Sequence, residues 1–234
     1  MAFRLRRCEA MLIDLHAHTF PLSDDSFLKP DELVEQAKAV GLDGVCLTEH
    51  DFFWEPSKAG ELARRHNFLV IPGVEVNTED GHMLVFGVDR YVYGMHRMRE
   101  LSAVVEQAGG AIIAAHPYRR LMPFYPGDDE LWSLALERAV ASPAFHHVCA
   151  LEAINGHGSQ HENLFSWQLC ARLGLPGVAG SDAHHVRELG TCATRFQQPI
   201  AHVGDLVREL KAARFHAVNL RGKAEAGDSD TTPA

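Results

Sequence analysis

Short apolar segments alternate with helical patterns along most of the chain. The apolar segments predict buried strands over 11–16, 43–50, 67–76, 82–88, 111–116, 147–155, 176–184 and 214–220. The amphipathic segments between them predict helices over 30–41, 57–66, 96–110, 128–140, 162–174 and 203–213. The turn sequence TEDG (78–81) predicts that the strand at 82–88 pairs with its predecessor.

Strands that alternate with helices predict right-handed βαβ units and a parallel sheet. About seven such units follow one another without a Pro-, Gly- or Ser-rich linker, which favours a barrel over an open sheet. We therefore expect one α/β domain over 11–221, preceded by an N-terminal extension (1–10). The small polar residues of 222–234 predict a disordered tail.

Fifteen histidines are unusual in a chain of 234 residues. The 31 acidic residues outnumber the 22 lysines and arginines, and the net charge of −9 argues against binding to a long nucleic-acid duplex. No apolar segment reaches the roughly 18 residues of a membrane span, and we expect no signal peptide. The five cysteines are scattered and form no C-x-x-C pair, which favours a reduced, cytoplasmic protein. Candidate metal ligands are therefore His, Asp and Glu.

Polar side chains gather at the carboxyl ends of the predicted strands, where a parallel barrel places its active site. They are His16, His18, His50, Glu75, His116, Asn155, His157, Asp182 and His184. His16 and His18 are two residues apart in an extended segment and point the same way, and Asp182 and His184 repeat that spacing.

Imidazoles with carboxylates suit Zn, Fe or Mn, and the number of candidates exceeds one tetrahedral set. The sequence therefore predicts a cluster of two or three ions, in which Glu75 can bridge two. Asp14 either hydrogen-bonds a loop or orients a ligand histidine.

The ordered segments DLHAHT (14–19), TEHD (48–51), GVEVN (73–77), AHPYR (115–119) and GSDAH (180–184) resemble the motifs of the polymerase and histidinol phosphatase (PHP) family. The resemblance is strongest to its small stand-alone metal-dependent phosphoesterases. It implies a distorted (β/α)7 TIM-like barrel. It also implies two or three divalent metal ions (Zn, Mn or Fe) at the C-terminal face of the strands.

The resemblance also implies a ligand set. The first ion would lie between His16, His18, Glu75 and Asp182, and Glu75 would bridge to a second ion that His116 completes. His50, His184 and Asp24 would hold a third. The remaining ligand of the second ion stays open between His157, His161 and Asn155, and the spacing favours His161. His82, on the extra hairpin 81–87, is a candidate substrate contact.

These residues predict hydrolysis of a phosphate ester by a hydroxide that bridges metal ions. Arg119 and Arg120 follow His116 and could grip the phosphate. His50, His184 or a metal-bound water could protonate the leaving oxygen.

The substrate stays open between a mononucleotide, a nucleoside bisphosphate, a sugar or histidinol phosphate, and a short oligonucleotide cut by a 3'-5' exonuclease-type phosphodiesterase. The alternatives are a non-catalytic metal-binding regulatory domain and a metal-dependent amide or cyclic-ester hydrolase. The second of these usually needs a lysine at a strand end, and we find none there. The oligomeric state is not predicted.

Overall fold

The computed structural model describes residues 10–125 and 127–221. Apart from Ala10, the predicted N-terminal extension lies outside these residues, as does the predicted tail 222–234. The strands are β1 (Met11–Asp14), β2 (Gly44–Leu47), β3 (Leu69–Pro72), β4 (Val74–Thr78), β5 (Gly81–Phe86), β6 (Ala111–Ala114), β7 (Ala150–Asn155), β8 (Gly177–Gly180), β9 (Cys192–Phe196) and β10 (Phe215–Asn219). All eight predicted strand segments are confirmed within a few residues of their ends.

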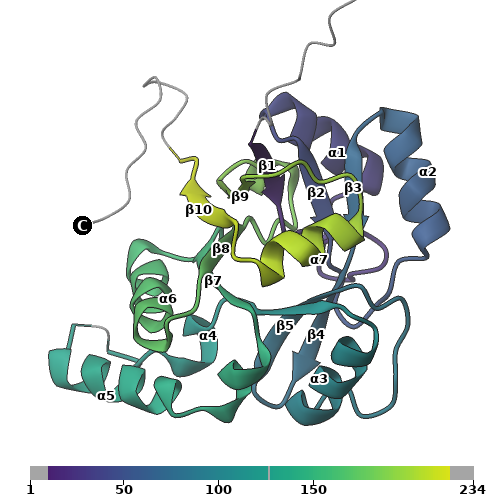
Figure 1. Ribbon diagram of the computed structural model, residues 1–234. Helices are drawn as coiled ribbons and strands as arrows, with labels where there is room; N and C mark the ends of the chain where they lie inside the picture. The colour runs from purple at the N-terminus through teal and green to yellow at the C-terminus, as the bar shows by residue number, and fades with distance from the viewer. Residues whose placement is uncertain (1–9, 126, 222–234) are drawn as a thin grey trace, which may run out of the picture.

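The strands form two five-stranded sheets (Figure 1). The first has the order β10-β9-β1-β2-β3 and the second has the order β4-β5-β6-β7-β8. The predicted distorted (β/α)7 TIM-like barrel is therefore not confirmed: the part of the chain that the structure describes forms two sheets and no closed barrel. Pairing is parallel in β1-β2-β3 and β6-β7-β8, but β5 runs antiparallel to both of its neighbours, and β9 runs antiparallel to β1 and β10.

The predicted strand 67–76 passes from one sheet into the other at Gly73. A Cβ atom at this position would lie 2.8 Å from Cδ1 of Phe86, so only glycine fits the crossing. The predicted pairing through the turn 78–81 is confirmed, because β4 and β5 form an antiparallel hairpin.

The two sheets approach each other along both edges of the second sheet, at β4 and at β8. A single parallel bridge joins His50, after β2, to Glu75 of β4, and another joins Ala17, after β1, to Ala183, after β8. Within β8, Ala179 N–H donates to Oγ1 of Thr194 on β9, and the Thr194 hydroxyl donates to the Ala179 carbonyl, both at 2.8 Å. A side chain thus replaces the ladder hydrogen bonds that a closed barrel would have here.

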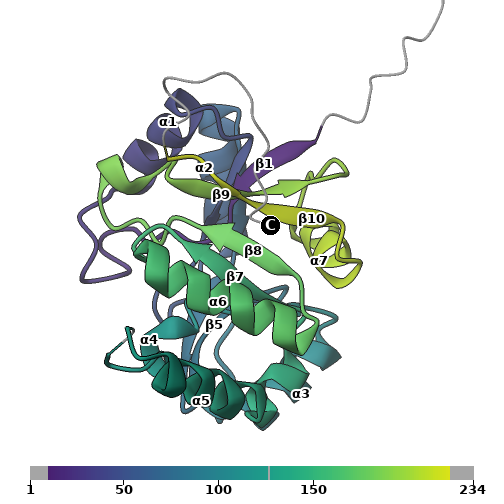
Figure 2. The ribbon, with the colours of Figure 1, turned by 90° about the vertical axis from the view of Figure 1, so that its left-hand side faces the viewer.

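Helices cover the outer faces of both sheets (Figures 1 and 2). They are α1 (Pro30–Ala39), α2 (Pro56–His66), α3 (Met98–Gln107), α4 (Tyr118–Leu121), α5 (Asp129–Val140), α6 (Gln160–Leu173) and α7 (Val203–Lys211), with short 3-10 turns at Pro143–His147 and Val186–Glu188. The six predicted helices are confirmed, and local signals set their ends. For example, α6 begins with a capping box of Ser159 and Glu162 and ends at Gly174 with a φ of 67°.

The three largest of the four hydrophobic clusters among the described residues stabilise the two sheets. One lies between them and joins Ile13 and Ile71 of the first sheet to Phe86 and Ile113 of the second. The others pack α1 and α2 on the first sheet, and α3, α5 and α6 on the second. None of the helices in residues 10–125 and 127–221 combines the length and apolar character that crossing a bilayer requires.

Candidate metal centre

Four buried side chains converge where the strands of both sheets end. His16 and His18 follow β1, Glu75 lies on β4, and Asp182 follows β8. The Nε2 atoms of both histidines lie 3.4 Å from Oε2 of Glu75, and 3.4 and 3.2 Å from Oδ1 of Asp182. All four residues are at most 1% exposed. The resemblance predicted this group as the first metal site, and the structure brings it together.

These four atoms have the geometry of a ligand set. None of them has a hydrogen-bond partner within the described residues. Ligand distances of about 2.0–2.1 Å in a tetrahedral zinc site correspond to edges of about 3.3–3.4 Å between ligand atoms. The four imidazole-to-carboxylate separations of 3.2–3.4 Å are of the length of such edges. A single divalent ion would satisfy all four orphaned atoms.

Hydrogen bonds at Nδ1 turn both histidines toward this point. His16 Nδ1 lies 3.0 Å from Oε1 of Glu152, which can only accept, so Nδ1 carries the proton. His18 Nδ1 lies 3.3 Å from Oγ of Ser23, whose own hydroxyl donates to Glu49. Both Nε2 atoms therefore present a lone pair to the centre, as a metal-ligating histidine requires.

The field at the centre favours positive charge. Burial opposes charging His16, but Asp182, Glu152 and Glu75 together hold its pKa well above the ordinary value. Burial alone would raise the pKa of Asp182, yet His16 and His18 hold it well below its usual range. A cation at this point would take over the neutralising role of the imidazolium.

A second group lies beside the first and shares Glu75. His116 Nε2 and His82 Nδ1 lie 2.8 and 2.9 Å from Oε1 of Glu75. The three residues form one of the candidate ligand groups of the structure. His82, predicted as a substrate contact, thus occupies the position for which His161, His157 and Asn155 were considered.

The other three candidates lie elsewhere. His161 is exposed on the first turn of α6 and packs edge-on against Trp132, with ring centroids 5.8 Å apart. The structure does not bring it to Glu75 and His116, and none of the candidate ligand groups among the described residues contains it. His157 lies 3.2 Å from Glu188, near His184. Asn155 is buried, and its Nδ2 donates to Oδ2 of Asp182 at 3.2 Å.

A third group consists of His18, His50 and His184, with an acid from the loop after β1. The acid is Asp25, whose Oδ2 lies 3.1 Å from His50 Nε2 and 3.4 Å from His184 Nε2. The prediction of Asp24 is corrected here: its side chain is exposed, and none of the polar contacts among the described residues involves it. His184 Nδ1 donates to the Asp182 carbonyl at 2.8 Å, and its Nε2 faces Asp25.

These neighbouring acids provide a matched pair of variants. We expect Asp25→Ala to weaken metal binding at the third position by at least about tenfold, because even outer partners of metal sites contribute that much. Asp24→Ala should bind metal like the unmodified protein. Elemental analysis of the metal-to-protein ratio after dialysis measures both. Equal loss in the two variants would contradict the assignment of Asp25.

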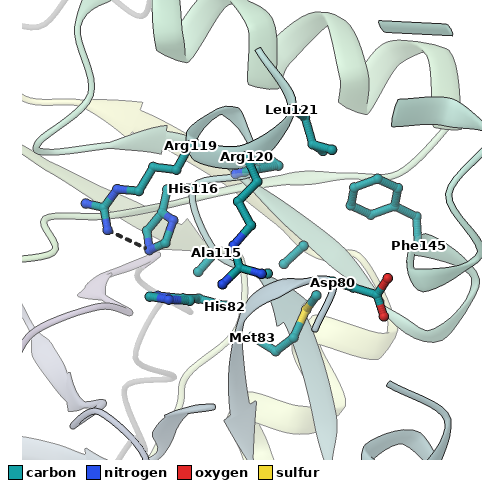
Figure 3. Close-up of a pocket in the computed structure, with 12 residues that line it drawn as sticks. Asp80, His82, Met83, Ala115, His116, Arg119, Arg120, Leu121 and Phe145 are labelled. Atoms are coloured by element: carbon teal, nitrogen blue, oxygen red, sulfur yellow. Dashed lines mark hydrogen bonds between the residues drawn. The ribbon is translucent and has the colours of Figure 1, made fainter. Parts of the chain in front are cut away.

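Arg119 and Arg120, predicted to grip a phosphate, begin α4 and line a pocket of about 250 Å³ beside the second group. Figure 3 shows that their side chains diverge. Arg119 Nη2 donates to Oδ2 of Asp182 at 2.5 Å, and its Nη1 lies 3.1 Å from His116 Nε2. Arg120 instead reaches the turn between β4 and β5.

Sequence reasoning did not assign a role to two buried carboxylates. Glu152 on β7 contacts His16 Nδ1, and its Oε2 accepts the backbone N–H of His116 at 2.8 Å. Glu49 accepts hydrogen bonds from Thr19, Ser23 and Trp54 and thereby fixes the loop after β1. The detectable signal was an acid inside an apolar strand, as in LEAIN (151–155). Asp14, left open above, accepts N–H groups of His16 and Ser181 and so fixes the backbone beside the ligands.

Comparisons with known proteins agree with this site. The model of the PHP domain matches residues 14–148, and that of the PHP-associated region matches 160–215. A probable phosphatase of Caldicellulosiruptor bescii is 25% identical over 206 residues, which are 77% of this chain and 82% of that protein. The chain spans only 6% of the length of an error-prone DNA polymerase of Nocardia farcinica, to which 64 residues (27% of this chain) are 34% identical.

Solved structures share the fold. PsfC from Pseudomonas syringae superposes with a TM-score of 0.60 at 21% identity, over 91% of this chain and 93% of that one. A Bacteroides vulgatus two-domain protein, described as containing a predicted PHP-like metal-dependent phosphoesterase, gives 0.60 at 20% identity, over 91% and 65%. The PHP model covers more than half of this chain, and all five quoted motifs fall on the convergent strand ends. The chain therefore belongs to the PHP family of metal-dependent phosphoesterases.

Proposed function

We propose that this protein hydrolyses phosphate esters of small metabolites or nucleotides, with two or three divalent ions (Zn, Mn or Fe) in the three groups described above. The observation that carries the proposal is the convergence of four buried ligand atoms that lack hydrogen-bond partners, from His16, His18, Glu75 and Asp182. The probable phosphatase of C. bescii supports the reaction class. Mixed imidazole and carboxylate ligands support Zn, Mn or Fe over Mg or Ca.

The ions would supply an activated water molecule and neutralise charge on the phosphoryl oxygens. His16, His18, Glu75 and Asp182 would hold the first. Glu75, His82 and His116 would hold the second. His18, His50, His184 and Asp25 surround the position of the third.

Arg119 stands at the mouth of this centre, with 39% of its side chain exposed. Its guanidinium is the positive group nearest to Asp182 and His116, and its remaining N–H donors can bind phosphoryl oxygens. It would orient the ester and stabilise charge that develops on the phosphoryl group.

The leaving oxygen needs a proton. The side chain of His184 is only 16% exposed, and its Nδ1 is bound to the Asp182 carbonyl. Of the two histidines predicted as donors, His50 is the more open to a bound ester, and we assign the role to it. It lies 2.9 Å from Glu75 and 3.1 Å from Asp25, and 31% of its side chain is exposed.

A phosphatase assay with and without chelator tests the function. The panel contains a mononucleotide, a nucleoside bisphosphate, a sugar phosphate, histidinol phosphate and a short oligonucleotide. We expect phosphate release from at least one ester, its loss with EDTA, and its return with added Zn, Mn or Fe. Release that EDTA leaves unchanged would contradict the metal-dependent mechanism. Metal-loaded protein that cleaves nothing would favour the non-catalytic metal-binding domain.

A further inference from the structure

The pocket beside the second ligand group contains an arginine that the reaction does not use. His82 and His116 line one side of this pocket, and Met83, Leu121 and Phe145 line the other. Arg119 reaches toward His116, whereas the guanidinium of Arg120 lies between His82 and Asp80 (Figure 3). The two guanidinium groups therefore face different parts of a bound molecule.

Arg120 is held in place by neutral groups. Its Nη1 donates to the carbonyls of Thr78 and Glu79, and its Nη2 donates to Oδ1 of Asn77, each at 3.2 Å. These acceptors belong to the β4–β5 turn, which the bond from Thr78 Oγ1 to the Gly81 carbonyl closes. The guanidinium is therefore positioned before any ligand binds, which lowers the cost of ordering it.

The charge of Arg120 is uncompensated. The ion pairs among residues 10–125 and 127–221 include Arg119 with Asp182 but none with Arg120. A guanidinium has five N–H donors, and three neutral acceptors leave about two for a ligand. A fixed cation with free donors beside a pocket is suited to bind a carboxylate or phosphate oxygen.

Asp80 is the acid that lines the same pocket. Figure 3 shows its carboxylate on the far side of the pocket, pointing away from Arg120. It therefore leaves the free edge of the guanidinium open, although its negative charge opposes an anion nearby. Removing the negative charge of Asp80 should therefore strengthen the binding of an anion at this position, which can be measured.

We propose that Arg120 binds a second anionic group on the substrate, carried by its alcohol part. The substrate class is then a phosphate ester whose leaving group bears a carboxylate or a further phosphate. This inference rests on the proposed function and adds a requirement for the part of the substrate that does not react. Arg119 and the ligand groups would act on the reacting phosphate, and Arg120 would select the leaving group.

Three esters with matched leaving groups test the proposal. Glycerol 3-phosphate has a neutral leaving group, 3-phosphoglycerate adds a carboxylate, and 1,3-propanediol bisphosphate adds a phosphate. We expect kcat/KM of the metal-loaded full chain to be higher for one or both of the esters with a second anion. The preferred ester tells carboxylate from phosphate recognition. Equal values for all three would overturn the proposal, even if all are hydrolysed.

Variants of Arg120 test whether this residue causes the preference for esters with a second anion. Arg120→Gln keeps a donor for the turn but removes the charge, and it should lower the anionic-to-neutral ratio of kcat/KM by about tenfold, the loss of one charged hydrogen bond. Arg120→Lys should restore part of the ratio, and Asp80→Asn should raise it. Misfolding or metal loss would lower all rates but leave the ratio unchanged. An unchanged ratio in well-folded Arg120→Gln would overturn the proposal.

A binding measurement separates this proposal from the proposed function. If none of the three esters is hydrolysed, calorimetry of the same esters with the metal-loaded protein gives the ratio of Kd values instead. Tighter binding of an anionic ester that Arg120→Gln abolishes would support the subsite while hydrolysis fails. Equal Kd values for all three esters would overturn it.

Discussion

Substitution of Asp182 by asparagine is expected to abolish hydrolysis and to lower metal content, while the fold persists. Oδ1 of Asp182 is one of the four orphaned atoms, and asparagine would replace the charged carboxylate with a neutral amide. We expect metal affinity to fall at least about 100-fold, because even partners outside the ligand shell contribute about 10- to 100-fold. Asparagine suits this position better than alanine, since Asp182 has a φ of 56°. His16→Ala should have the same effect.

Elemental analysis, phosphate release and circular dichroism measure these effects together. Asp129→Asn is the control, because Asp129 is exposed on the first turn of α5 and makes no contact with the ligand residues. It should keep full activity and metal content. A well-folded Asp182→Asn variant with full activity would contradict the assignment of the centre.

Gly180→Ala is expected to disrupt the metal centre by displacing His16 and the residue that orients it, Glu152. The added Cβ atom would clash with Cβ of His16 and would lie 2.8 Å from Oε1 of Glu152 and 3.0 Å from the backbone nitrogen of His16. Oε1 of Glu152 accepts the hydrogen bond from His16 Nδ1 that orients His16 in the centre. Overpacking of this kind costs about 1–3 kcal/mol, so we expect lower stability and weaker metal binding together.

Gly60→Ala is the matched control for this substitution. Gly60 lies inside α2, where an added Cβ atom meets only the flexible end of Arg64, at 3.4 Å. Alanine should raise the free energy of unfolding by up to about 1 kcal/mol, because it favours the helix. Denaturant titration with and without added metal measures both variants. Destabilisation by both substitutions, or by neither, would contradict the close fit at Gly180.

The sequence predicted the elements well because their signals are local. Hydrophobic periodicity and capping residues located the helices, and strand-end polarity located His16, Glu75 and Asp182. The strand β9 was missed because Thr194 and Arg195 interrupt its apolar character. The role of Thr194 depends on its partner Ala179, which belongs to the other sheet. The hydrophobic periodicity of a short segment contains no information about such a contact between two distant strands.

The errors within the centre have a similar cause. Asp24 and Asp25 are adjacent in a loop, and spacing alone does not show which of them faces His50. His82 was predicted as a substrate contact, and not grouped with Glu75 and His116, because its position depends on strand register. Glu75 lies opposite Leu84, and β5 also pairs with β6, so His82 comes to lie between Glu75 and His116. His161 has a plausible distance along the chain but lies on a helix that points elsewhere.

An ion bound at the first ligand group would cross-link the two sheets. The first ligand group takes His16 and His18 from one sheet and Glu75 and Asp182 from the other, beside the bridges at Ala17–Ala183 and His50–Glu75. A ligand that binds only the folded chain adds about 2.7 kcal/mol of stability when its concentration is 100 times Kd. The concentration of available metal would thus influence how often the two sheets separate, and how often the chain becomes open to proteases. Scarcity of metal would then shorten the lifetime of the protein as well as abolish its catalytic activity.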